Sequence, residues 1–115
     1  MPTRLPEWID EARLSPRWRD VRTVLGHGPG GENLGKTLDL SEGGAAIRFE
    51  RPPFPVPGRL WRFSVVFERG VRTLAGRVVY VRPDGRIGVR WEALSKGDAA
   101  FLRGRYSSGT RGRVT

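Results

Sequence analysis

Between residues 21 and 91, short runs of β-branched and aromatic residues recur, and in several runs apolar and polar positions alternate. Alternation with a period of two is typical of strands that bury one face. The pattern predicts six strands, at residues 21–25, 37–40, 45–49, 60–67, 72–82 and 87–91. Turn-forming residues separate these runs. They predict a Gly-rich loop, a tight turn, a Pro-rich crossover and a hairpin tip, at residues 27–33, 42–44, 51–58 and 83–85.

Short strands at this spacing favour an all-β fold. We expect a six-stranded antiparallel β-barrel, because closure of the sheet removes exposed strand edges. A helical pattern follows the last strand. Ser95 and Asp98 form an N-terminal capping box, and an apolar face comprises Ala99, Leu102 and Tyr106.

The two ends of the chain differ from the barrel region. Residues 6–14 predict a short helix that begins at Pro6, where a first helical turn accepts proline. The polar, Gly-containing end of the chain is expected to be disordered. We therefore expect an N-terminal segment, a barrel domain with a C-terminal helix, and a tail, at residues 1–12, 13–106 and 107–115.

The size and composition of the chain are those of one small globular domain. It has 115 residues, of which 37% are hydrophobic, and no cysteine. No apolar run approaches the roughly 18 residues that a membrane span needs. The first twelve residues contain acidic side chains and no apolar stretch, unlike a signal peptide. Because the absence of cysteine also fits a reducing compartment, we expect a cytoplasmic protein without membrane insertion.

The charge balance indicates an anionic partner. The chain has 21 basic and 12 acidic residues, a net charge of +9, and only two of the basic residues, Lys36 and Lys96, are lysines. Arginine binds phosphate with two parallel hydrogen bonds and also stacks on planar rings. The charge alone leaves nucleic acid, a nucleotide and a lipid headgroup open, and many of these arginines can simply be solvated.

One stretch, Gly30–Thr37, fits the phosphate-loop pattern G-x-x-x-x-G-K-[ST]. A phosphate loop works only where a strand enters it and a helix starts at its Lys-Thr pair. Here the following residues alternate like a strand and soon reach a Ser-Glu-Gly-Gly turn, so we interpret the match as a coincidence. The sequence shows no carboxylate pair, metal cluster or Ser-His arrangement, and His27 is the single histidine. We expect no enzyme activity, no metal and no cofactor.

Two further motifs flank the first predicted strand. The residues from Arg13 to Arg17 read R-x-x-x-R, and the stretch containing Asp39, Ser41 and Gly44 reads D-x-S-x-x-G. In this order they resemble the motifs of the PilZ family of cyclic di-GMP receptors. The resemblance extends from residue 13 to residue 106. It implies a six-stranded antiparallel barrel with the C-terminal helix packed at one end, in agreement with the prediction from the pattern.

The resemblance implies a ligand site for cyclic di-GMP, formed by Arg13, Arg17, Asp39, Ser41, Gly43 and Gly44. The chemistry is consistent with this, because arginine donates to phosphate or to guanine O6 and N7, and a carboxylate accepts from guanine N1–H and N2–H. Tyr80 is an additional candidate for stacking on guanine, and Arg48 for contacting phosphate. The alternatives are that Asp39 and Ser41 only close a turn, that Tyr80 belongs to the core, and that Arg48 is solvated.

The implied function is a cyclic di-GMP receptor or adaptor that changes conformation and signals through an unidentified effector protein. A small basic barrel that binds nucleic acid and a PilZ-like protein scaffold are the alternatives. Many family members carry a further arginine where this chain has Ala12, so we expect a monomer that binds one ligand. Residues 12–20 offer few core anchors, and we expect ligand binding to order them.

Overall fold

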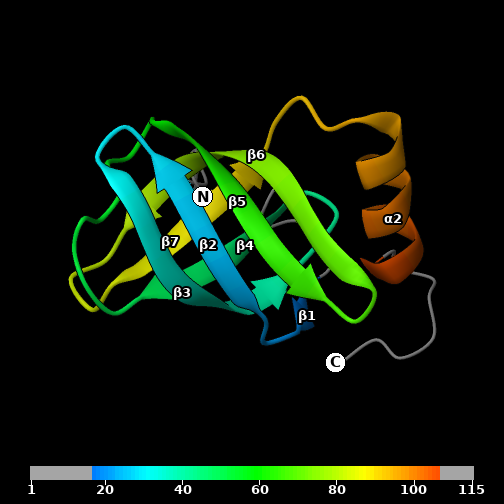
Figure 1. Cartoon of the computed structure of the whole chain (residues 1–115), viewed down its shortest axis with the longest axis horizontal. Coiled ribbons are helices and arrows are strands. Elements are labelled where there is room, and N and C mark those ends of the chain that lie inside the picture. The colour runs from blue at the N-terminus through cyan, green and yellow to red at the C-terminus, as the bar shows by residue number, and fades with distance from the viewer. Residues whose placement is uncertain (1–16, 107–115) are drawn as a thin grey trace, which may run out of the picture.

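The computed structural model describes residues 17–106, which form one antiparallel β-barrel with a helix beside it (Figure 1). The barrel strands follow the order β3-β2-β5-β6-β7-β4, and β4 pairs back with β3 to close the ring. A short strand, β1, pairs with the C-terminal end of β3. The elements are β1 (Trp18–Arg19), β2 (Thr23–Gly28), β3 (Gly31–Leu40), β4 (Gly44–Phe49), β5 (Leu60–Phe67), β6 (Gly70–Val81), β7 (Arg86–Trp91) and α2 (Lys96–Tyr106). The six-stranded antiparallel barrel predicted from the sequence is confirmed.

The alternating apolar side chains of the strands fill the inside of the barrel. On β5, for example, every second residue is buried, and Phe63 and Val65 have no exposed surface. Five strand aromatics are buried in this core: Phe49, Trp61, Phe63, Phe67 and Trp91. Tyr80 is the one aromatic side chain of the described strands that lies outside this core cluster.

The β2–β3 hairpin differs from the prediction. The Gly-rich loop expected at residues 27–33 is a tight turn at Pro29–Gly30, and β3 begins at Gly31 instead of residue 37. The reason is that glycines occupy positions of this hairpin where other strands carry apolar side chains, so the sequence shows no alternation of apolar and polar residues there. A Cβ atom at Gly28 would lie 2.0 Å from the Trp61 ring, which fills the space that a side chain would need.

Helix α2 lies at one end of the barrel, beside the turn between β5 and β6 (Figure 1). The predicted N-cap is confirmed, because the Asp98 amide donates to Ser95 Oγ over 3.0 Å. The buried face of the helix includes Leu102 and Tyr106. The ring of Phe101 packs edge-on against Phe67, with 4.8 Å between the ring centroids. The predicted helix at residues 6–14 and the tail at residues 107–115 lie outside the described residues.

Candidate functional site

The two motifs meet in a direct contact between Arg17 and Asp39. β1 pairs with the end of β3, which brings Arg17 beside the carboxylate of Asp39. Arg17 Nε donates to Asp39 Oδ1 over 2.9 Å, and a second guanidinium nitrogen donates to the same oxygen. The amide of Ala46 on β4 also donates to this oxygen, over 3.2 Å. Both charged side chains remain about a quarter exposed, at 24% and 28%, so a ligand can reach them.

A β-bulge in β3 directs Asp39 to the outer surface of the barrel. The register between β3 and β4 shifts between Thr37 and Asp39, so that Asp39 stands opposite Ala46 while Leu40 turns inward and is fully buried. Without this extra residue the strict alternation of the strand would place Asp39 and the buried Thr37 on the same inner face. The bulge therefore makes the carboxylate available at the surface.

Ser41 builds the turn that follows Asp39. Its hydroxyl oxygen accepts from the amides of Gly43 and Gly44 over 3.2 and 3.0 Å, and its own amide donates to the Gly44 carbonyl over 2.9 Å. The Trp91 indole donates to the Ser41 carbonyl over 3.3 Å. Because Ser41 has no exposed surface, its hydroxyl shapes the turn, as the turn-closing alternative anticipates. Gly43 completes this turn and is partly exposed, and Gly44 begins β4.

A cross-strand row connects Asp39 to Tyr80 on the outer face. Asp39 is opposite Ala46, Ala46 is opposite Gly88, and Gly88 is opposite Tyr80. A Cβ atom at Gly88 would lie 2.0 Å from the Tyr80 ring, so the ring lies directly over the glycine backbone. The row thus has an acid at one end, two small residues in the middle, and a half-buried aromatic ring at the other end. A flat base can approach the backbone closely on such a surface.

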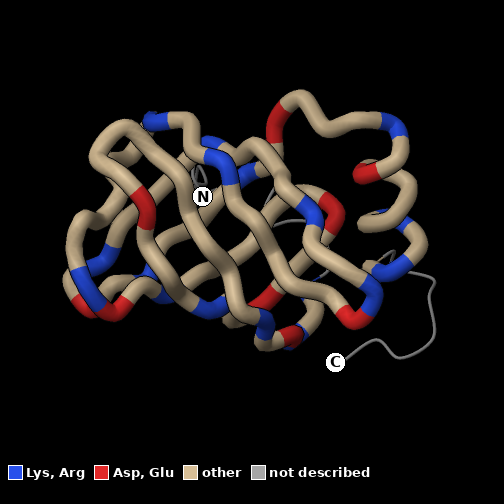
Figure 2. Tube along the Cα trace, viewed as in Figure 1, with Lys and Arg blue, Asp and Glu red and all other residues tan. Residues whose placement is uncertain are grey.

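Basic side chains stand on both sides of this row. On one side, the neighbouring row consists of Lys36, Arg48 and Arg86. The two rows are two residues apart along each strand, which is roughly 7 Å. Arg48 contacts Asp84 over 3.4 Å, and the buried Nε of Arg86 has no hydrogen-bond partner among the described residues. On the other side lies Arg90, opposite Gly44. Figure 2 shows that Lys and Arg are spread over the whole barrel, so charge alone does not locate the site.

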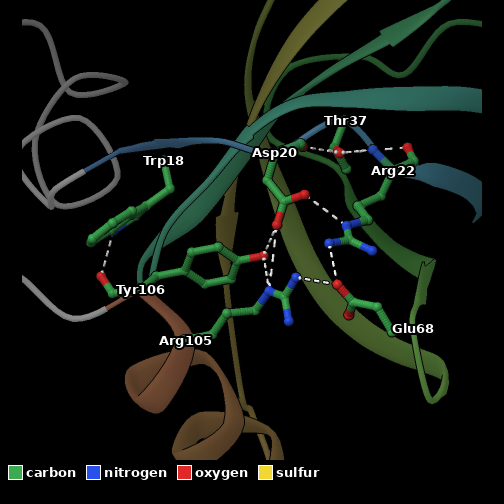
Figure 3. A network of polar contacts seen from close by, with 7 residues as sticks. All are labelled: Trp18, Asp20, Arg22, Thr37, Glu68, Arg105 and Tyr106. Carbon is green, nitrogen blue, oxygen red and sulfur yellow. Dashed lines mark hydrogen bonds and ion pairs between the residues drawn. The ribbon is translucent and has the colours of Figure 1, made fainter. Parts of the chain in front are cut away.

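A polar network fixes the segment after Arg17 to the end of helix α2 (Figure 3). The Trp18 indole donates to the Tyr106 carbonyl over 2.7 Å, and the Tyr106 hydroxyl donates to Asp20 Oδ2 over 2.6 Å. Asp20 Oδ1 accepts from Arg22 Nε over 2.7 Å. Trp18 is 5% exposed and belongs to the core. The expectation that this stretch offers few core anchors is therefore wrong for residues 17–20.

The same network extends to the β5–β6 turn and to β3. Glu68 accepts from Arg22 over 2.7 Å and from Arg105 over 2.9 Å. Thr37 Oγ1 donates to the Asp20 carbonyl over 2.6 Å and accepts from the Arg22 amide over 2.7 Å. The segment between Arg17 and β2 is therefore held both by α2 and by the residue of β3 that precedes the bulge.

The network changes the pKa values of its members. Burial by itself raises the pKa of Asp20, but hydrogen bonds from Tyr106 and Arg22 outweigh it, so this pKa lies below its ordinary value. Burial raises the pKa of the Tyr106 hydroxyl, and its hydrogen bond to Asp20 raises it further. Hydrogen bonds from Arg105 and Arg22 lower the pKa of Glu68 to about 2. The network thus favours an ionised Asp20 and Glu68 with a neutral tyrosine.

The stretch Gly30–Thr37 is not a phosphate loop. It consists of the hairpin turn and most of β3, which pairs with β2 on one side and β4 on the other. Lys36 is exposed on the outer face. His27 contacts Glu32 and Ser64, and no group of metal-ligating side chains occurs within residues 17–106. In the same range, no helix has the length and apolar character needed to cross a membrane.

Sequence reasoning located part of this site. The structure brings together Arg17, Asp39, Ala46 and the Ser41–Gly44 turn, whereas Arg48 lies two residues further along β4 and Tyr80 lies on β6, beyond the intervening strand β7. Arg13 lies outside the described residues. The bulge and the Asp20 network were missed. The pairing of a tryptophan with an aspartate directly after R-x-x-x-R was the available signal for the network, but its partners follow much later in the chain.

Comparison with known proteins places these features in a family. A family model for the PilZ domain matches residues 11–106. The chain is similar to the PilZ domain of CeSA from a cellulose-synthesizing bacterium, with a TM-score of 0.64 and 22% identity over 75% of this chain and 89% of that one. It is also similar to the inhibitor of motility MotI/DgrA of Bacillus subtilis, with a TM-score of 0.64 and 19% identity over 78% of this chain and 47% of that one. At these identities the likeness concerns the fold. No curated protein matches the sequence.

Proposed function

This chain belongs to the PilZ domain family, and from that premise we propose that it is a receptor for cyclic di-GMP that signals through a partner protein and not by catalysis. The observation that carries the proposal is the contact between Arg17 and Asp39, which joins the two family motifs on an accessible surface. The small residues Ala46 and Gly88, which lie between that contact and the Tyr80 ring, supply room for a flat base.

The ligand takes the place of the contact between Arg17 and Asp39. Partly exposed ion pairs contribute only about 0–1 kcal/mol, so opening this one costs little. Arg17 can then donate to a phosphate or to guanine O6 and N7, while Asp39 accepts from guanine N1–H and N2–H. The Ser41 turn holds Gly43 and Gly44 in the conformation that lets the base approach. Arg13 and Arg48 supply further donors for the phosphates, and Tyr80 offers a ring for stacking.

The signal passes through the segment that follows Arg17. Trp18 is the next residue, and its indole is bonded to the last residue of α2. A ligand that draws Arg17 away from Asp39 therefore acts on a segment that is bonded to the helix, to the β5–β6 turn and to β3. We expect this segment to take a second arrangement when the ligand binds, because an element with two discrete arrangements transmits binding free energy to a distant surface.

Calorimetric titration of the purified protein tests the proposal. Cyclic di-GMP should bind saturably, whereas GTP and single-stranded DNA at the same concentrations should not compete. Because Ala12 occupies the position of the additional family arginine, we expect one ligand per monomer and no ligand-driven dimer. A stoichiometry near two contradicts the single-ligand site. Absence of cyclic di-GMP binding, or equally strong binding of DNA, contradicts the proposed function.

A further inference from the structure

The outer face of β3 carries a groove that lies next to the proposed ligand site and shares Arg48 with it. It has a volume of about 500 Å³. Leu34 and Lys36 project from β3 into solvent between Val21 on one side and Arg51 on the other. Leu34 is 62% exposed and Val21 is 55% exposed. Large apolar side chains gathered in a concave surface at such exposure are typical of an interaction site.

The charges around this groove are available to a partner. Lys36 and Arg51 form no ion pair within residues 17–106, and Arg48 has only its 3.4 Å contact with Asp84. Some arginines elsewhere on the barrel are neutralised, as Arg77 is by two hydrogen bonds to Glu92. The lining residues of the groove include a single carboxylate, Glu50. The groove therefore combines an apolar floor with a surplus of positive charge.

We propose that this groove is the docking site for a segment of the effector protein, in which aspartate or glutamate residues flank apolar side chains. The identity of the occupant as an effector rests on the proposed function. The occupant's apolar residues cover Leu34 and Val21, and its carboxylates pair with Lys36 and Arg51. Nucleic acid fits less well, because no aromatic side chain of residues 17–106 lines the groove for bases to stack on.

The walls of the groove continue directly into the proposed ligand site. Leu38 lines the groove and precedes Asp39, and Val21 lines it and follows Asp20. Thr37, which lies between Lys36 and Leu38, is bonded to the Asp20 carbonyl. A ligand that repositions Arg17 and Asp39 therefore changes the spacing of the two walls. We expect cyclic di-GMP to change the affinity of the docked segment by about 5- to 150-fold, the usual range for coupled sites.

A displayed library of random 12-residue peptides, sorted on the purified protein with and without cyclic di-GMP, supplies the probe. Enriched peptides should contain aspartate or glutamate next to leucine, isoleucine, valine or phenylalanine. Leu34→Ser and Lys36→Glu should each weaken their binding at least tenfold. Two matched controls lie outside the groove: Leu60→Ser, at a 47% exposed leucine on β5, and Lys96→Glu, at the exposed start of α2, should leave binding unchanged.

Several results overturn the docking site. They are the enrichment of basic peptides, the absence of enrichment, and enriched peptides that bind Leu34→Ser and Lys36→Glu as well as the wild type. Binding of single-stranded DNA or phosphatidylglycerol vesicles that depends on Leu34 and Lys36, without any such peptide, also contradicts it. Leu34→Ser should keep its cyclic di-GMP affinity within twofold. Intact cyclic di-GMP binding without any peptide that depends on Leu34 and Lys36 therefore refutes the groove alone, whereas groove-dependent peptides without cyclic di-GMP binding refute the proposed function alone.

Discussion

Replacement of Tyr106 by phenylalanine removes one hydroxyl from the Asp20 network and keeps the buried ring. In the native protein this hydroxyl donates to Asp20 Oδ2 over 2.6 Å and accepts from Arg105 Nε over 3.0 Å. A hydrogen bond to a charged group contributes about 1.5–3 kcal/mol. Asp20 keeps its bond from Arg22, so its charge stays compensated. We therefore expect Tyr106→Phe to lower the free energy of unfolding by about 1.5 kcal/mol, at the lower end of that range.

Urea denaturation of the ligand-free protein measures this change, and a double-mutant cycle assigns it to the contact. Tyr106→Phe and Asp20→Asn should be coupled by about 1 kcal/mol, because each removes one partner of the same bond. Ser95→Ala removes the N-cap at the other end of α2 and is the matched control. Its cost, about 1 kcal/mol, should add to that of Asp20→Asn. A Tyr106→Phe effect below about 0.5 kcal/mol, or additivity with Asp20→Asn, refutes the network as a structural link.

Three further predictions follow from the site and the network. Lys36→Ala should change cyclic di-GMP affinity by less than about 0.5 kcal/mol, and tight GTP binding abolished by this substitution would instead support a phosphate loop. Gly88→Ala places a Cβ atom 2.0 Å from the Tyr80 ring and so displaces that ring. Calorimetry should show cyclic di-GMP binding weaker by about 1 kcal/mol, the value of a lost stacking contact, while the circular dichroism spectrum stays unchanged. The pKa of Glu68 is lowered to about 2. The stability difference between the wild type and Glu68→Gln should therefore be complete above about pH 4.5, shrink as the pH falls, and be lost as the pH passes below about 2. A difference of constant size from pH 4.5 down to pH 2 contradicts the ion pairs of Glu68.

The sequence predicts the barrel strands well where buried and exposed positions carry apolar and polar side chains in alternation. The buried positions of β5 are aromatic or β-branched, and so are the inward-facing Ile87, Val89 and Trp91 of β7, so the alternation is visible in the residues themselves. The β2–β3 hairpin was missed because Gly28 leaves the space beside Trp61 to that ring, and a glycine gives no alternation to read. Helix α2 was predicted because Ser95 and Asp98 mark its start locally.

Some contacts of the candidate site can likewise be predicted from the sequence, and others cannot. Two motifs that flank one strand can be expected to meet, and Arg17 does contact Asp39. The contacts of Trp18 and Asp20 with Tyr106 could not be predicted, because 88 and 86 residues separate the partners and only the closed barrel brings them together. Local patterns carry information about neighbours along the chain, and the network depends on the packing of α2 against the barrel.

Comparison of two neighbouring arginines tests the central claim most directly. Arg17 contacts Asp39, whereas Arg19 is exposed and forms no ion pair within the described residues, so their alanine variants remove the same charge at nearly the same place. In calorimetric titrations with cyclic di-GMP, Arg17→Ala should weaken binding by about ten- to a hundredfold, the equivalent of one charged hydrogen bond. Arg19→Ala should stay within twofold of the wild type. Equal losses in the two variants, or an unchanged affinity for Arg17→Ala, would contradict a ligand site built on Arg17 and Asp39.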